Sequence, residues 1–118
     1  MIDDGRLGVV ESRFADIIWK NEPIKSGELV KICDVELDWR KSTTYTVLKK
    51  LCDKGLFQNV KGLVTAVVTK ERFYELQGET IVNAAFDGSL AGFVAEYAKN
   101  NPLSQEEIDA IVKQLTEK

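Results

Sequence analysis

The stretch from residue 39 to residue 56, WRKSTTYTVLKKLCDKGL, constrains this chain most, because it predicts one strongly two-sided helix. At 100° per residue, the apolar face centres on Leu48 and includes Leu51, Cys52 and Gly55, flanked by Thr44 and Tyr45. The opposite face carries short hydroxyls and ammonium groups, namely Thr43, Thr46 and Lys50, bordered by Ser42, Lys49 and Lys54. Such a face suits a helix in a DNA major groove, where hydroxyls reach base edges and lysines neutralise phosphates. A solvated amphipathic helix explains the pattern equally well.

The distribution of charge favours a nucleic-acid partner, although the formal net charge of the 118-residue chain is −3. Residues 38–72 carry eight basic and three acidic groups, a net charge of +5, while the segments before and after carry −3 and −5. A basic island between acidic flanks is typical of a DNA-binding face on an acidic scaffold.

Composition excludes several other classes of protein. No apolar run approaches the roughly 20 residues of a membrane span, and the N-terminus lacks a signal peptide, so we expect a cytoplasmic protein with no membrane partner. The chain has no histidine, which removes Ser-His and Cys-His catalysis. Cys33 and Cys52 lie on apolar helix faces and are expected in the core, with a redox role as the alternative. We predict a non-enzyme that binds no cofactor and no metal.

Two helices are predicted ahead of this stretch. Apolar residues at helical spacing from Val10 to Ile18 predict a helix that ends near Lys20. Ser26 is expected to cap a second helix, and residues 34–38, which have no periodicity, are expected to form the turn before the next helix.

A β-hairpin is predicted after the stretch. Residues 56–60 and 63–69 are β-rich runs separated by Lys61-Gly62. Helix, helix, turn, helix and hairpin is the order of a winged helix-turn-helix, which places the third helix in the groove and Lys61 at the wing tip beside phosphate. A solvated turn lysine is the alternative interpretation of Lys61.

The remaining chain is predicted to be helical over residues 70–86, from Ser89, and from a capping box of Ser104 and Glu107. Two short helices with narrow apolar stripes bury little area on their own, so we expect a second copy to cover them. Folding back onto the wing domain is the alternative. The predicted dimer residues are Phe86, Leu90, Phe93, Val94, Tyr97, Ile108, Ile111, Val112 and Leu115.

The predicted fold is therefore mainly α with a small β-hairpin wing. Residues 1–70 form a winged helix-turn-helix DNA-binding domain, and residues 71–118 form a helical dimerisation region. A winged-helix protein-interaction module is one alternative function. A regulator that senses a small molecule in a pocket lined by Phe86, Phe93 and Tyr97 is another.

Four groups of residues carry a family resemblance: Ile17-Ile18-Trp19, Asp38-Trp39 before the Thr-rich helix, Leu51-Cys52-Asp53-Lys54-Gly55-Leu56, and Phe86-Asp87-Gly88-Ser89-Leu90 with Leu103-Ser104-Gln105-Glu106-Glu107-Ile108. In this order and spacing, from about Leu7 to Leu115, the chain resembles the penicillinase and methicillin-resistance repressors of the BlaI/MecI/CopY type. The resemblance implies a cytoplasmic transcriptional repressor that is homodimeric through its C-terminal helices and bound to a palindromic double-stranded DNA operator.

The resemblance also implies roles for individual residues. It places Ser42, Thr43, Thr46 and Lys50 in the groove, Lys41 and Lys49 towards phosphate, and Lys61 on the wing. It further implies an inactivating protease as a partner, but the matching bond reads Glu96-Tyr97 where the family has Asn-Phe. The C-terminal cysteines of copper-responsive members are missing, and the wing over residues 62–68 is more apolar than is usual in the family.

Overall fold

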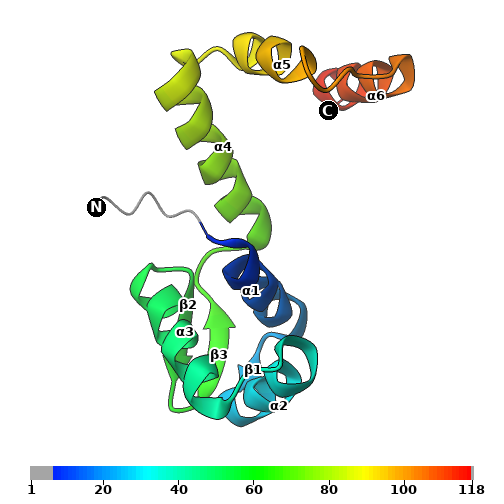
Figure 1. The fold of residues 1–118 in the computed structure, drawn as a ribbon. Coiled ribbons are helices and arrows are strands. Elements are labelled where there is room, and N and C mark those ends of the chain that lie inside the picture. Colours follow the sequence, from blue (N-terminus) through cyan, green and yellow to red (C-terminus); the bar gives the residue numbers. More distant parts are fainter. Residues whose placement is uncertain (1–6, 118) are drawn as a thin grey trace. The chain divides into compact units, whose positions relative to one another are not determined.

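A computed structural model describes residues 7–117, which divide into two compact units (Figure 1). The first unit ends at Gln77 and the second begins at Gly78, within the helix α4 (Lys70–Phe86). The domain boundary predicted from the sequence lies at residue 70, where α4 begins. Because the first unit extends to Gln77, the first turns of α4 belong to the same compact unit as the elements that precede it.

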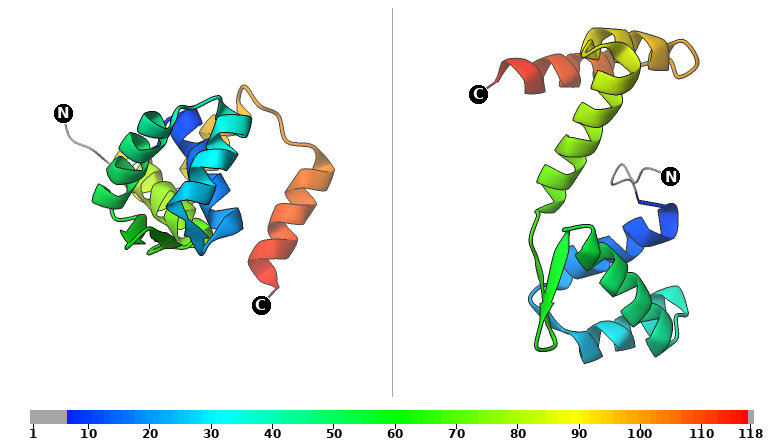
Figure 2. Two further views of the ribbon diagram at one scale, coloured as in Figure 1. Left: turned by 90° about the horizontal axis from the view of Figure 1, so that it is seen from below. Right: turned by 90° about the vertical axis from the view of Figure 1, so that its left-hand side faces the viewer.

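The first unit contains three helices and a small sheet. The helices are α1 (Val9–Asn21), α2 (Ser26–Leu37) and α3 (Lys41–Asp53), and the strands are β1 (Ile24–Lys25), β2 (Phe57–Val60) and β3 (Leu63–Ala66). The sheet is antiparallel with the order β1-β3-β2. Figure 2 shows the three helices gathered on one side of the hairpin. This arrangement confirms the predicted winged helix-turn-helix.

The core of the first unit is built from the apolar faces of all these elements. Its largest fully buried apolar side chains are Phe14 and Ile18 from α1, Leu29 from α2, Leu48 and Leu51 from α3, and Phe57 and Val64 from the hairpin. Removing these side chains from water is the main force that fixes the helices against the sheet. Cys33 is also fully buried, and Cys52 is half-buried, as expected of core cysteines without a disulfide.

The structure corrects two expectations about α2. Ser26 is the first helical residue and not the N-cap, which is Lys25. Its backbone N–H donates to Gly62 O of the hairpin turn, so a long-range contact decides where the helix begins. Residues 34–37 continue α2, and the turn starts at Asp38, whose left-handed backbone (φ 55°) ends the helix. An aspartate adopts this conformation more readily than most residues.

The hairpin turn lies at Lys61-Gly62, as predicted. Lys61 and Gly62 have φ of 52° and 85°, and Val60 pairs with Leu63 across them. Positive φ at both central residues is characteristic of the tight turns whose twist matches that of the two strands. The pairing of β1 with β3 was not predicted, because Ile24 and Val64 lie 40 positions apart in the chain and such pairing has no local signal.

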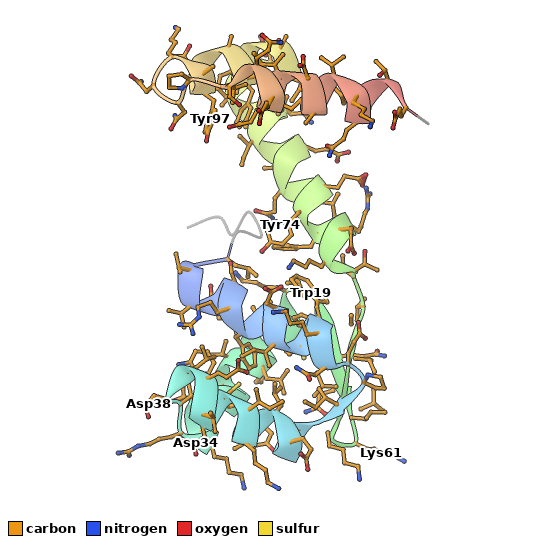
Figure 3. The ribbon with its side chains drawn as sticks, turned by 90° about the vertical axis from the view of Figure 1, so that its right-hand side faces the viewer. Trp19, Asp34, Asp38, Lys61, Tyr74 and Tyr97 are labelled. Atoms are coloured by element: carbon orange, nitrogen blue, oxygen red, sulfur yellow. The ribbon has the colours of Figure 1, made fainter. Side chains whose placement is uncertain are left out.

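The start of α4 is attached to α1 by an aromatic cluster and an ion pair. The Trp19 ring lies 5.8 Å from Phe73 and 6.3 Å from Tyr74 between centroids, and Figure 3 shows Trp19 beside Tyr74. Trp19 Nε1 also donates to Val68 O at 3.0 Å. Lys70 Nζ lies 2.6 Å from Asp16 Oδ1, and this hydrogen bond raises the pKa of Lys70.

The second unit contains the C-terminal part of α4 together with α5 (Leu90–Ala98) and α6 (Gln105–Thr116). Ser104 caps α6 by accepting a hydrogen bond from the N–H of Glu107, as predicted. Ser89, from which a helix was predicted to start, caps α5 by accepting from the N–H of Gly92. None of the residues from 78 to 117 is buried. Among the helices that the structure describes, none combines the length and the apolar character needed to cross a membrane.

Candidate nucleic-acid interface

The buried side of α3 fixes which of its residues face outward. Leu48, Leu51 and Thr44 are at most 2% exposed, and they hold the helix against the core. Thr44 is the only polar residue among those described as buried, and its Oγ1 donates to Arg40 O at 3.4 Å. α3 begins at Lys41, two residues later than predicted, and Gly55, just after its end, has a left-handed backbone (φ 88°).

The residues of α3 that were predicted to contact DNA all lie on its outward side. All six side chains are exposed: Lys41, Ser42, Thr43, Thr46, Lys49 and Lys50. Lys54, at the border of the predicted face, is partly buried. The first turn contains Lys41 and no acidic residue, so positive side chains lie at the positive end of the helix dipole. An anion such as a phosphate is the natural partner of that end.

The two lysines in the last turns of α3 take part in ion pairs. Lys49 Nζ lies 3.2 Å from Asp53 Oδ2, one turn further along the helix. Lys50 Nζ lies 2.7 Å from Glu11 Oε2 on α1, and the hydrogen bond from Lys50, followed by that from the Gly8 N–H, lowers the pKa of Glu11. Lys50 is therefore directed towards the first turn of α1, although its side chain is still 56% exposed.

Lys61 occupies the tip of the wing, as Figure 3 shows. Its side chain is exposed, and it is flanked by the exposed apolar residues Val60 and Leu63. Lys25 lies opposite Leu63 in the β1–β3 pair and is exposed too. Lys25 was not predicted from the sequence, because only the strand pairing brings it close to the wing tip.

Arg40 is a second cation that the sequence analysis did not assign to the interface. It is exposed and is the N-cap residue of α3, directly before Lys41. Its position in the sequence could have indicated a DNA contact, because a basic residue at the N-terminus of a helix that enters a groove lies close to backbone phosphates.

Apolar side chains on the outside of the second unit form a different kind of surface. Among the predicted dimer residues, exposure ranges from 36% at Val94 to 68% at Leu115, with Phe86 and Phe93 partly buried against each other. The two rings meet edge to face at 5.3 Å, which leaves less room for the predicted pocket of Phe86, Phe93 and Tyr97.

The Glu96-Tyr97 bond lies inside α5 with both side chains exposed, and Glu96 pairs with Lys99 at 2.9 Å. No group of three Cys, Asp or Glu residues within 7–117 is arranged to hold a metal ion.

Comparisons of the sequence with known proteins identify its family. The family model described as penicillinase repressor matches residues 7–117. The chain is 27% identical over 120 residues to the penicillinase repressor of Bacillus licheniformis, covering 98% of this chain and 90% of that protein. It is 21% identical over 116 residues to the methicillin resistance regulatory protein MecI of Staphylococcus aureus strain Mu50, covering 95% and 94%. The matches span both compact units.

Proposed function

The chain belongs to the penicillinase repressor family, whose members are DNA-binding transcriptional repressors, and on this premise we propose that it represses transcription as a homodimer on a palindromic operator. The family assignment confirms the resemblance inferred from the sequence. The observation that carries the proposal is the exposed face of hydroxyls and lysines on α3, opposite the buried Leu48 and Leu51.

In this proposal, the N-terminal half of α3 reads bases. Ser42, Thr43 and Thr46 have hydroxyls of the right length to reach base edges in the major groove. Lys41 and Lys49, together with Arg40, contact the flanking phosphates. Lys61 and Lys25 contact phosphate on the wing side. Lys50 contributes positive charge that Glu11 partly compensates.

The proposed dimer is supported by the exposed apolar stripes of α5 and α6. Exposure of apolar side chains to water is unfavourable. Several side chains of these stripes are 40–68% exposed, namely Leu90, Tyr97, Ile111, Val112 and Leu115. A second copy has the same stripes, and pairing the two copies about a two-fold axis buries the stripes of both. Two copies of α3 related by that axis then contact two half-sites of one operator.

Selection from a random-sequence duplex library tests the proposal. The full chain is expected to enrich an inverted repeat with half-sites separated by about one helical turn, ~10 base pairs, or a multiple of it. Sedimentation equilibrium of the same preparation is expected to show a dimer, and the complex should contain two chains per duplex. Enrichment of sequences without inverted symmetry, or a monomer on the selected duplex, would contradict the homodimer and the palindrome.

The same selection separates the two alternative functions. A protein-interaction module would enrich no duplex at moderate salt, whereas a repressor should retain its selected sequence. A small-molecule sensor would release that duplex only in the presence of its ligand. Cleavage at Glu96-Tyr97 by a protease remains a prediction from the resemblance, and the masses of the fragments from cells in the induced state would test it.

A further inference from the structure

Two hydrogen bonds connect α3 to the turn of the wing through one residue. The hydroxyl of Tyr45, on the flank of α3, donates to Ser26 Oγ at 3.0 Å. The backbone N–H of Ser26 donates to Gly62 O at 2.8 Å, and Gly62 is the neighbour of Lys61 in the hairpin turn. The side chain of Tyr45 and the main chain of the wing turn therefore meet at the first residue of α2.

Side-chain packing leaves space between α3 and the wing beside this connection. An open groove of about 380 Å³ lies between α3 and β2, and it is lined by Tyr45, Leu48, Lys49, Cys52 and Asn59. Tyr45 is partly buried at one wall of the groove. A directional hydrogen bond restricts relative motion more than a loosely filled apolar contact, because it loses energy steeply with angle and distance.

The pairing of β1 with β3 completes the connection. Ile24 pairs with Val64 and Lys25 with Leu63, so the strand that leads into Ser26 is part of the wing sheet. Ser26 is thus joined to the wing by its own N–H and by the strand before it, and to α3 by its hydroxyl.

We propose that Tyr45 and Ser26 are positioning residues that hold the wing turn at a set distance from α3. Lys61 can then contact phosphate while Thr43 and Thr46 contact bases. Because the wing is already held in place, binding does not incur the additional entropy cost of ordering it. The inference rests on the proposed DNA-binding function and adds to it the residues that make the two sets of contacts interdependent.

A double-mutant cycle tests the interdependence in the full chain. The probe is the duplex that the unaltered protein enriches from a random library, and the readout is the dissociation constant by fluorescence anisotropy. Lys61→Ala is expected to weaken binding several-fold in the unaltered protein. In the Tyr45→Phe background, the same change should cost at least about twofold less, because the wing is already displaced.

Ser26 provides a second route to the same measurement. Ser26→Ala removes the acceptor and leaves Tyr45 unchanged, so it should give the same coupling with Lys61 as Tyr45→Phe does. Ser26→Thr keeps the hydroxyl and should restore the full cost of Lys61→Ala. Circular dichroism and thermal melting identify which variants are folded under the conditions of the assay.

A matched control separates positioning from a general loss of wing stability. Gln58→Ala removes the hydrogen bond from Gln58 Nε2 to Thr65 Oγ1 (3.1 Å), which lies within the wing and does not involve α3. Its effect should add to that of Lys61→Ala without coupling. Equal coupling in the Gln58→Ala background would overturn the inference.

The other outcomes distinguish the inference from the function on which it rests. If the unaltered protein enriches no duplex, the proposed function fails. If it binds the selected duplex but Lys61→Ala has no effect, or costs the same in all backgrounds, the function stands and the positioning role of Tyr45 and Ser26 is wrong.

Discussion

The ammonium group of Lys50, near the end of α3, lies 2.7 Å from the carboxylate of Glu11, in the first turn of α1. The same carboxylate accepts a hydrogen bond from the Gly8 N–H through its other oxygen at 3.1 Å. Glu11 is only 20% exposed, so the pair is better shielded than a typical surface ion pair. One acidic side chain therefore both caps α1 and offsets positive charge on the proposed DNA-binding face.

Glu11→Gln is expected to strengthen DNA binding. The amide oxygen can still accept from Gly8, but a carboxylate at this position no longer competes with phosphate for the ammonium group of Lys50. The slope of log affinity against log salt should become steeper by about 0.9, the value for one additional phosphate contact. Glu28→Gln is the control, because it also raises the net charge by one and removes an exposed ion pair, that with Lys31 at 3.8 Å within α2. Equal slopes for both variants would contradict the expectation.

Thr46 and Thr44 lie two residues apart on α3 but on opposite sides of it. Thr46→Ala should leave the melting temperature unchanged and cost about 1–3 kcal/mol of discrimination between selected and scrambled duplexes, because Thr46 is exposed. Thr44→Ala should leave the discrimination between the two duplexes unchanged. It should lower the free energy of unfolding by roughly 1–2 kcal/mol, because Thr44 is 1% exposed. Equal weakening of both duplexes by Thr46→Ala would show that its hydroxyl reads no base.

Sequence reasoning succeeded for α3 because its two faces are set by local spacing. Residues three and four apart share one side of any helix, so the burial of Leu48 and Leu51 and the exposure of Thr43 and Thr46 follow from the sequence. The caps at Ser89 and Ser104 were predictable for the same reason, since each serine binds an N–H only three residues away.

The errors lie where distant residues decide the structure. Ser26 looks like a cap, but its N–H binds Gly62 O, 36 positions away in the chain. The error at residues 34–37 is of a different kind, because a helical segment that buries few side chains, here with Val35 84% exposed, shows no apolar period in its sequence. The contacts of Lys50 with Glu11 and of Tyr45 with Ser26 also join separate elements. Periodicity contains no information about any of these contacts.

Lys61→Asn is expected to separate folding from DNA binding. Lysine at φ 52° is in a conformation that costs most side chains roughly 1–2 kcal/mol, and asparagine tolerates it better. The variant should therefore be more stable by about 0.5–1 kcal/mol in urea unfolding, while its affinity for the selected duplex falls several-fold. Lys31→Asn, on the exposed side of α2, controls for the loss of one positive charge. Unchanged affinity would remove Lys61 from the interface.

The two cysteines should differ in their reactivity. Burial, supported by the charge of Glu36 and opposed by a hydrogen bond with Thr44, raises the pKa of Cys33 from 9.0 to about 11. Burial also raises the pKa of the half-buried Cys52. Labelling by a thiol reagent at pH 8 should therefore be slow at both residues and slowest at Cys33, as measured separately in Cys52→Ser and Cys33→Ser.

The raised pKa of Cys33 also predicts a loss of stability at high pH. The thiol ionises in the unfolded chain from pH 9.0, while the folded chain keeps it protonated to about pH 11. Its contribution to stability is complete below pH 9 and is lost as the pH rises towards 11. Denaturant unfolding at several pH values should show a steeper decline for the unaltered chain than for Cys33→Ala, and parallel declines would contradict the prediction.

Val112→Glu is expected to break the proposed dimer without unfolding the chain. Val112 is 53% exposed in α6, so glutamate is tolerated in an isolated copy, but pairing of the stripes would bury its charge without a partner. The dimer dissociation constant should rise by at least about tenfold, ~1.4 kcal/mol. Ala110→Glu adds the same charge on the opposite, exposed side of the same helix and should leave the dimer intact. Sedimentation equilibrium measures both, and equal dimerisation of the two variants would show that the stripe on α6 is not the interface.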